Sequence, residues 1–105
     1  MASGRLGASD LAATTNTTVY TVPASKVAVA TVSLCNRNAG GVAVRVAIST
    51  SGTPANADYI EHDTIIPGNT TLERSGLVMD ASKQLVVYAG ATGISAVCWG
   101  YEESA

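Results

Sequence analysis

Apolar and polar side chains alternate most regularly between residues 27 and 50. From residue 42 to residue 49, the even positions carry Val, Val, Val and Ile, and the odd positions carry Ala, Arg, Ala and Ser. A period of two residues is typical of a β-strand with one buried face and one solvated face. The intervening segment NRNAGG, at 36–41, is rich in residues that tolerate positive φ. The pattern therefore predicts two strands, 27–38 and 42–50, joined as a hairpin.

Shorter segments of the same kind fill the rest of the chain, with turn residues between them at intervals of about 8–12 residues. The further strands are predicted at 17–22, within 58–66 (one or two), and at 70–79, 84–91 and 94–102. A β-bulge is expected at Gly76, because glycine inside a strand pattern often marks one. The last strand is expected to pair with an early one.

Seven or eight short strands without a convincing helix predict an all-β protein, a single antiparallel β-sandwich of the jelly-roll type. The 105 residues suit one domain, and residues 14–105 are expected to form it. Residues 1–13 are mostly small and polar, with Leu6 and Leu11 as apolar anchors. We expect this segment to be an extended N-terminal arm that becomes ordered on a neighbouring subunit.

The composition indicates the stability and the oligomeric state to be expected of the domain. Charged residues make up only 13% of the chain, whereas about a quarter is usual. The hydrophobic fraction of 47% is mostly Ala and Val, with one Trp, four Tyr and no Phe. Small side chains bury little apolar area, so the isolated domain is expected to have modest stability. Burial against other copies would add to that stability, which favours a homo-oligomer.

Charge and hydropathy exclude two classes of partner. The six basic residues are scattered and the net charge is −2, so we expect no nucleic-acid binding. No apolar run approaches the roughly 20 residues of a membrane-spanning helix, and we expect no membrane association. The N-terminal residues contain no apolar segment of the kind found in secretory signals. Release from the cell is therefore expected to occur by another route, such as lysis.

The two cysteines, Cys35 and Cys98, permit two interpretations. Without a secretory signal, the first is a pair of buried thiols that behave as small apolar side chains. Both cysteines lie near the ends of predicted strands and could be neighbours, so a disulfide stays open.

The densest group of ionisable side chains is Asp58, Glu61, His62 and Asp63. Carboxylates and an imidazole could bind a divalent cation, but their spacing matches no metal motif. A solvated edge strand whose charges prevent aggregation is the structural alternative. His62 is the single histidine, and no nucleophile motif accompanies it. We therefore predict that the chain is not an enzyme and needs no cofactor.

The aromatic residues Tyr59, Tyr88, Trp99 and Tyr101 could form a sugar-binding platform or could simply pack. Trp99 and Tyr101 alternate along the last predicted strand on the same face as Val97. Packing in the core or at an interface is the expected role of these two.

Three segments together resemble small virion proteins of tailed bacteriophages. They are LAATTNTTVYTVPA at 11–24, ATVSLCNR at 30–37, and the group at 58–67 in which DYI precedes Asp63 and Ile66-Pro67. The likeness covers most of residues 11–101, and its motifs are structural rather than catalytic. The resemblance implies a particle component that is assembled in the bacterial cytoplasm and belongs to the virion.

The resulting hypothesis is a virion structural accessory protein that decorates or cements the capsid, the neck or the tail through subunit contacts. Its expected partners are other copies of itself, with a trimer among the expected forms, and the major virion proteins. The predicted interface residues are Leu6, Leu11, Trp99 and Tyr101. The alternative is a receptor- or glycan-binding module of a phage fibre, which would use the loops 36–41, 51–57 and 90–93.

Overall fold

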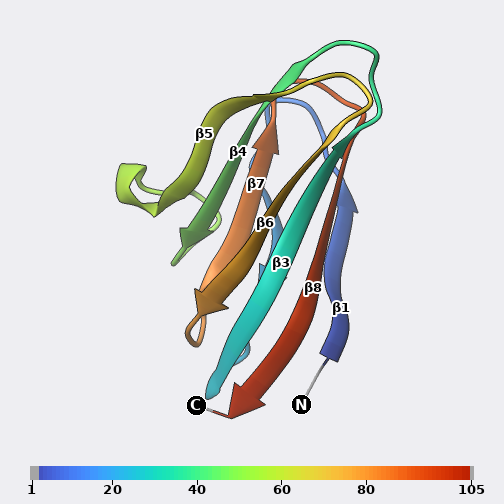
Figure 1. Ribbon diagram of the computed structural model, residues 1–105. Helices are drawn as coiled ribbons and strands as arrows, with labels where there is room; N and C mark the ends of the chain where they lie inside the picture. The colour runs from blue at the N-terminus through green and yellow to red at the C-terminus, as the bar shows by residue number, and fades with distance from the viewer. Residues whose placement is uncertain (1–2, 105) are drawn as a thin grey trace.

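The computed structural model describes residues 3–104, which form two four-stranded antiparallel sheets packed face to face (Figure 1). In chain order the strands are β1 (Ser3–Asp10), β2 (Thr17–Thr21), β3 (Lys26–Asn36), β4 (Val42–Ser49), β5 (Tyr59–Ile66), β6 (Thr71–Met79), β7 (Gln84–Ala89) and β8 (Ile94–Ser104). The helical structure of these residues is the three-residue 3-10 turn η1 (Asn56–Asp58). No helix in the described chain could therefore cross a bilayer.

The strand order identifies the fold. Sheet A has the order β1-β8-β3-β6, and sheet B has the order β2-β7-β4-β5. Eight strands distributed between two sheets in this order form a jelly roll. The β8 strand pairs with β1 on one side and with β3 on the other. The predictions of an all-β sandwich and of a last strand beside early ones are confirmed.

The two central strands do not form a hairpin, which corrects the prediction from the alternation pattern. β3 lies in sheet A and β4 lies in sheet B, so the segment 37–41 carries the chain from one sheet to the other. Both strands do bury their even-numbered side chains, from Ala28 to Asn36 in β3 and from Val42 to Val46 in β4. These two faces meet in the core. The period shows which face of a strand is buried, but it does not determine which strand pairs with it.

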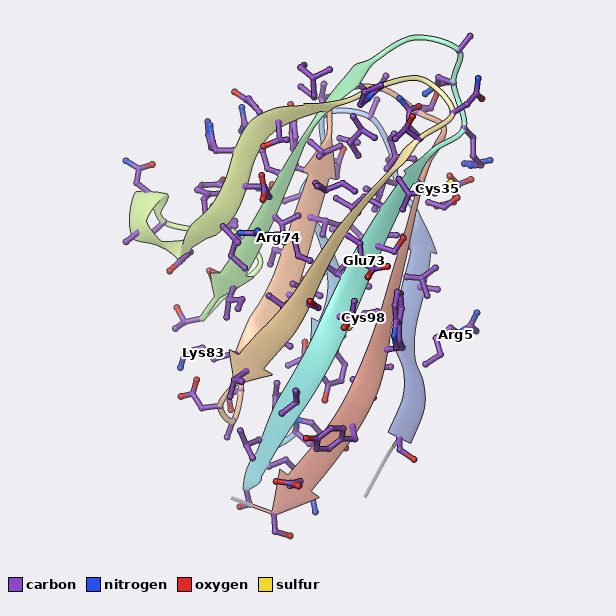
Figure 2. All side chains as sticks on the ribbon, viewed as in Figure 1. Arg5, Cys35, Glu73, Arg74, Lys83 and Cys98 are labelled. Atoms are coloured by element: carbon purple, nitrogen blue, oxygen red, sulfur yellow. The ribbon has the colours of Figure 1, made fainter. Side chains whose placement is uncertain are left out.

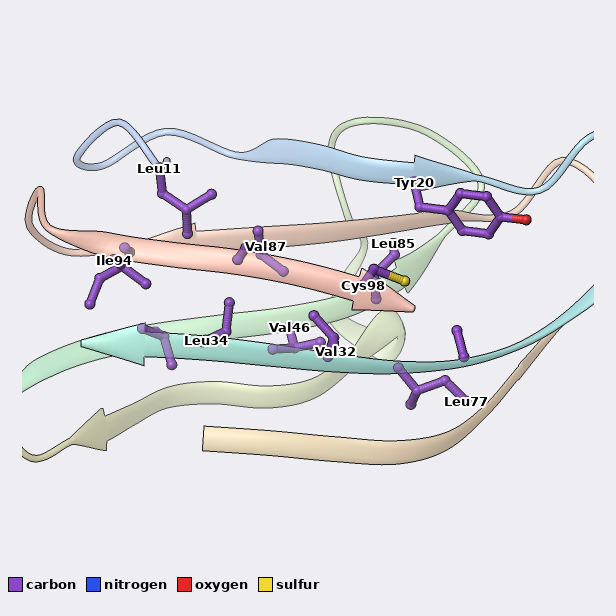
Figure 3. Packing of buried hydrophobic residues seen from close by; sticks show 14 of the residues in the cluster. Leu11, Tyr20, Val32, Leu34, Val46, Leu77, Leu85, Val87, Ile94 and Cys98 are labelled. Atoms are coloured by element: carbon purple, nitrogen blue, oxygen red, sulfur yellow. The ribbon is translucent and has the colours of Figure 1, made fainter. Parts of the chain in front are cut away.

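The core lies between the sheets and consists mainly of small aliphatic side chains (Figure 3). Its largest fully buried side chains come from both layers, Leu34, Met79 and Ile94 from sheet A and Leu85 from sheet B. Every buried side-chain nitrogen or oxygen of the described residues has a hydrogen-bond partner. The polar side-chain atoms that are buried in residues 3–104 are therefore satisfied within the chain.

Residues 3–10 form β1, an edge strand of sheet A, so a separate N-terminal arm over residues 1–13 is not confirmed. β1 pairs with β8, with a bulge between Arg5 and Gly7. Leu11 is only 2% exposed and belongs to the core, while Leu6 is partly buried against it. The first two residues of the predicted arm lie outside the described residues. Both leucines therefore pack in or against the core of their own chain, because β1 pairs with β8 of the same chain.

Gly7 lets β1 approach the other sheet closely. A Cβ atom at this position would lie 2.1 Å from the backbone oxygen of Val19 in β2. A hydrogen in place of a side chain removes this clash. This contact closes the sandwich along the β1 and β2 edges.

β6 contains the bulge predicted at Gly76. Its pairing register with β3 shifts between Ala30 and Val32, so that Ser75 and Gly76 together lie opposite the single residue Thr31. Gly76 has a φ of +69°, which glycine adopts without steric cost. A bulge on an edge strand disrupts the ladder that another chain could extend.

Candidate functional site

The ionisable group at 58–63 is reshaped by a bulge in β5. Val46 of β4 pairs with Glu61, but Val44 pairs with Thr64, so two residues intervene where regular pairing has one. Asp63, one of those two, has a φ of +54°. The regular alternation of faces that the sequence predicts is therefore interrupted within residues 58–63. The side chains of this group point in different directions and contact different partners.

Asp63 pairs with an arginine on the outer surface of sheet B. Its Oδ1 accepts a hydrogen bond from Nε of Arg45 at 2.7 Å, which lowers the pKa of the carboxyl and raises the pKa of the guanidinium. The same guanidinium lies 4.5 Å from the ring centroid of Tyr88. His62 contacts the ring of Tyr59 edge-on, with centroids 4.9 Å apart. This arrangement is a solvated network of ion-pair and aromatic contacts.

The other two carboxylates also have protein partners. Glu61 accepts a hydrogen bond from Oγ1 of Thr64 at 2.7 Å and pairs with Nε of Arg74 at 3.0 Å. Because Arg74 belongs to β6 and Glu61 to β5, this pair links the edges of the two sheets. Asp58 accepts a hydrogen bond from the backbone N–H of Ala55. Within residues 3–104, no three His, Cys, Asp or Glu side chains gather in a group that could hold a metal ion.

Cys35 and Cys98 are free thiols, so the disulfide alternative is wrong. They belong to opposite faces of sheet A, because Cys98 lies on the buried side of β8 and Cys35 on the half-buried side of β3. Burial raises the pKa of the Cys98 thiol to about 11. A thiol with so high a pKa is protonated at neutral pH and is a poor nucleophile. The prediction of two buried thiols is right for Cys98 and wrong for Cys35.

The four aromatic residues do not form one platform. Trp99 and Tyr101 lie on the outer face of sheet A, whereas Tyr59 and Tyr88 belong to sheet B. Tyr88 contacts an arginine and Tyr59 contacts His62, as described above. Trp99 and Tyr101 therefore share the outer face of sheet A, and Tyr59 and Tyr88 lie near Arg45 on the outer face of sheet B.

That surface is the most exposed apolar region of the described chain. Val78, Trp99 and Tyr101 are 65%, 38% and 42% exposed, and they account for three of the four exposed large hydrophobic side chains. Val29 lies directly opposite Tyr101 on one side and opposite Val78 on the other. The "apolar face" of sheet A is defined here by Val29, Val78, Val97, Trp99 and Tyr101. It extends over three adjacent strands that the chain order places far apart.

The apolar face includes two of the four predicted interface residues, Trp99 and Tyr101, and excludes Leu6 and Leu11. Val29 and Val78 were not predicted to belong to a site. The sequence does contain a signal for Val29, because β3 carries apolar side chains at both odd-numbered and even-numbered positions between Val27 and Val32. A strand that is apolar on both faces is covered on both faces. In this domain the outer side chains of β3 are half-buried between the neighbouring strands β8 and β6.

Two of the three candidate recognition loops lie together at one end of the sandwich. The backbone N–H of Arg37 donates to the carbonyl of Gly93 at 2.9 Å, and Nδ2 of Asn38 donates to the carbonyl of Thr92 at 2.8 Å. These bonds join the loops 36–41 and 90–93. The loop 51–57 leaves β4 at the opposite end, close to η1 (Figure 1).

The buried side chain of Asn36 organises the first of these loops. Its Nδ2 donates to the carbonyls of Gly40 and Ile66, each at 2.9 Å, and its Oδ1 accepts from the backbone N–H of Asn38. The three bonds fix the crossing from sheet A to sheet B. This loop is therefore held in one conformation by its own chain.

A shallow depression of about 310 Å³ lies between β1 and β8. It is lined by Ala8, Ser9, Asp10, Ser95, Ala96 and Val97. Asp10 pairs with Arg37 at the surface, and His62 lies in sheet B, on the strand farthest from β1. The lining contains the hydroxyl groups of Ser9 and Ser95 and the carboxylate of Asp10, and the imidazole of His62 does not belong to it.

Comparisons with known proteins identify no relative. A scan against protein-family models, a search of curated proteins and a search of solved structures each return no match.

Proposed function

We propose that this chain is a structural accessory protein of a tailed-bacteriophage particle, where it decorates or cements the capsid, neck or tail through subunit contacts. The observation that carries the proposal is the apolar face, where a tryptophan, a tyrosine and three valines project from one flat sheet. Contiguous exposed apolar surfaces are candidates for interaction sites. The action of the protein is burial of that surface, not chemistry.

The fold and the composition support the same proposal. Jelly rolls occur among viral capsid proteins and lectins, although a fold alone does not determine function. Four of the five residues of the apolar face lie on two strands, β3 and β8, that pair along their entire length. A rigid, hydrogen-bonded surface loses little entropy when a partner covers it, which suits a protein that holds other subunits in place.

The surroundings of Trp99 and Tyr101 favour a protein partner over a glycan. Sugar sites combine aromatic stacking with convergent polar side chains that bond the hydroxyls. Here the neighbours across the strands are Thr31 and Arg5 for Trp99, and Val29 and Ser3 for Tyr101, so no carboxylate or amide side chain lies directly opposite either ring. The loop 51–57 lies at the opposite end of the sandwich from the loops 36–41 and 90–93, so the three candidate recognition loops do not form one receptor-binding tip.

The proposal is tested on particles. An antibody against the purified chain is applied to particles from a lysate of cells that carry its gene, and gold label is located by electron microscopy. We expect label at a fixed position on the head, the neck or the tail. The variant Trp99→Ser/Tyr101→Ser should fold but should not be incorporated, whereas Tyr88→Ser, on sheet B, should be incorporated normally. Label confined to the soluble fraction would contradict the proposal.

A further inference from the structure

We infer that the apolar face binds the same face of a second copy of this chain, about a two-fold axis parallel to the strands of sheet A. The inference rests on the proposed function, because it names the first partner that covers the proposed contact surface. Three features of sheet A carry it: its dimensions, the chemistry of its centre, and the charges at its two edges.

The dimensions of sheet A match those of a stable interface. Its four strands have 8, 11, 9 and 11 residues. Strands about 4.8 Å apart, with a rise of about 3.3 Å per residue, give a flat area of about 500 Å² over eight residues. The relief of the side chains increases the accessible surface beyond this flat area. A standard protein interface buries about 800 Å² on each partner, so the face is large enough for one.

The centre of the face suits packing against another sheet. Tyr101, Val29 and Val78 form a row across β8, β3 and β6. Aliphatic and aromatic side chains of two such rows can interdigitate, as they do between the layers of a β-sandwich. An apolar centre with charges at the rim is also the usual composition of an interface between subunits.

The rim carries opposite charges on opposite edges. Arg5 lies on the β1 edge, and Glu73 lies on the β6 edge, on the face of sheet A that Figure 2 shows toward the viewer. Within residues 3–104 neither side chain makes a salt bridge, although Asp10, Glu61, Asp63 and Asp80 each have a basic partner. The two rim charges are therefore free to pair with another molecule.

These charges select the orientation of the second copy. An axis parallel to the strands places β1 of one copy over β6 of the other, so Arg5 approaches Glu73 at two symmetric positions. Arg5 pairs in register with Trp99 of β8, and Glu73 is level with Val97 of β8. The two positions are therefore two residues apart along the strand direction. That offset is about 6.6 Å, which an extended arginine side chain can cover. An axis across the strands would instead place β1 over β1 and bring the two Arg5 side chains together.

The size of the particle in solution tests the inference. Sedimentation equilibrium of the purified chain should give a mass of about 21 kDa, twice the 10.6 kDa of one chain. Val78→Arg should give a monomer. Ile65→Arg is the matched control, because Ile65 is equally aliphatic and exposed but belongs to β5 of sheet B. The Ile65→Arg variant should remain a dimer. Circular dichroism should show that the Val78→Arg and Ile65→Arg variants both retain their strands.

Charge reversal tests the orientation. Arg5→Glu and Glu73→Arg should each weaken dimerisation by about tenfold, because two attractive rim pairs become two repulsive ones. The double variant Arg5→Glu/Glu73→Arg restores complementarity and should regain the wild-type dissociation constant. Single variants that bind as tightly as wild type, or a double variant weaker than both, would overturn the two-fold arrangement.

The outcomes separate this inference from the proposed function. A monomer at the highest soluble concentration, a trimer, or a dimer that survives Val78→Arg would overturn the inference. Gold label on particles would still support a structural role in each of those cases. A dimer of the expected kind without label on any particle would support the inference and contradict the phage assignment.

Discussion

A buried hydrogen bond between the two sheets offers the sharpest test of how this sandwich is stabilised. The hydroxyl of Tyr20 in β2 donates to Oε2 of Glu102 in β8 at 2.5 Å. Glu102 is only 7% exposed, and within residues 3–104 its carboxylate accepts from no other hydrogen-bond donor. Removing this donor leaves a carboxylate that burial has deprived of most of its water.

We expect Tyr20→Phe to lower the free energy of unfolding by about 2 kcal/mol, because hydrogen bonds to charged groups contribute about 1.5–3 kcal/mol. For a domain of this size each kcal/mol corresponds to about 4–8 °C in Tm, so Tm should fall by about 8–16 °C. The ring itself remains, and the packing of Tyr20 in the core should change little.

The pH dependence of stability provides a second measure of the same bond. Burial, and then the hydrogen bond and charge of Glu102, raise the pKa of Tyr20 above its ordinary value of 10. The folded chain therefore holds this proton more tightly than the unfolded chain does. The stability that this proton contributes to the folded chain is fully present below pH 10. It is lost as the pH rises from 10 toward the pKa that Tyr20 has in the folded chain. Tyr20→Phe should abolish this part of the alkaline destabilisation.

Urea unfolding, followed by circular dichroism, measures both effects. Tyr88→Phe is the matched control, since Tyr88 is a half-buried tyrosine of sheet B whose hydroxyl makes no side-chain hydrogen bond among the described residues. It should change stability by less than about 0.5 kcal/mol. Tyr20→Phe/Glu102→Leu removes both partners and should recover much of the loss. A Tyr20→Phe variant as stable as Tyr88→Phe would refute the reasoning.

Three further predictions concern Leu11 and the two thiols. Leu11→Ala should cost about 2–5 kcal/mol in urea unfolding, because Leu11 is a buried core residue rather than part of a free arm; a loss below about 0.5 kcal/mol would contradict this placement. For the thiols, a maleimide should label Cys35 in the native protein and Cys98 only after unfolding, as mass spectrometry can show. The pKa of Cys98, about 11 against an ordinary 9, also implies stability that is complete below pH 9 and lost as the pH rises through 11. Cys98→Ala should remove that component, and equal labelling of both native thiols would exclude burial of Cys98.

The sequence alone determined the strands and several of their local details. Alternation with a period of two is a property of one strand and its two faces, so the buried valines of β4 were evident before any pairing was known. The bulge at Gly76 was equally local, because it depends on the φ values that a single residue can adopt. The sparse charge and the lack of catalytic motifs also favoured contact over chemistry, which stays a prediction.

Only the tertiary structure decided which strands are neighbours. The turn at 37–41 was expected to reverse the chain within one sheet, but it crosses between sheets because the buried faces of β3 and β4 pack against each other. Likewise, the residues before Leu11 offered few apolar anchors, yet β1 finds its hydrogen-bond partners in β8, almost a full chain length away.

The candidate site depended on this long-range pairing most of all. Val29, Val78 and Tyr101 form one row only because β3 lies between β8 and β6 with a particular register. A shift of one residue would turn these side chains to the opposite face of the sheet. Register is set by the fit of many distant side chains in the core at once, and local sequence patterns contain no information about that fit.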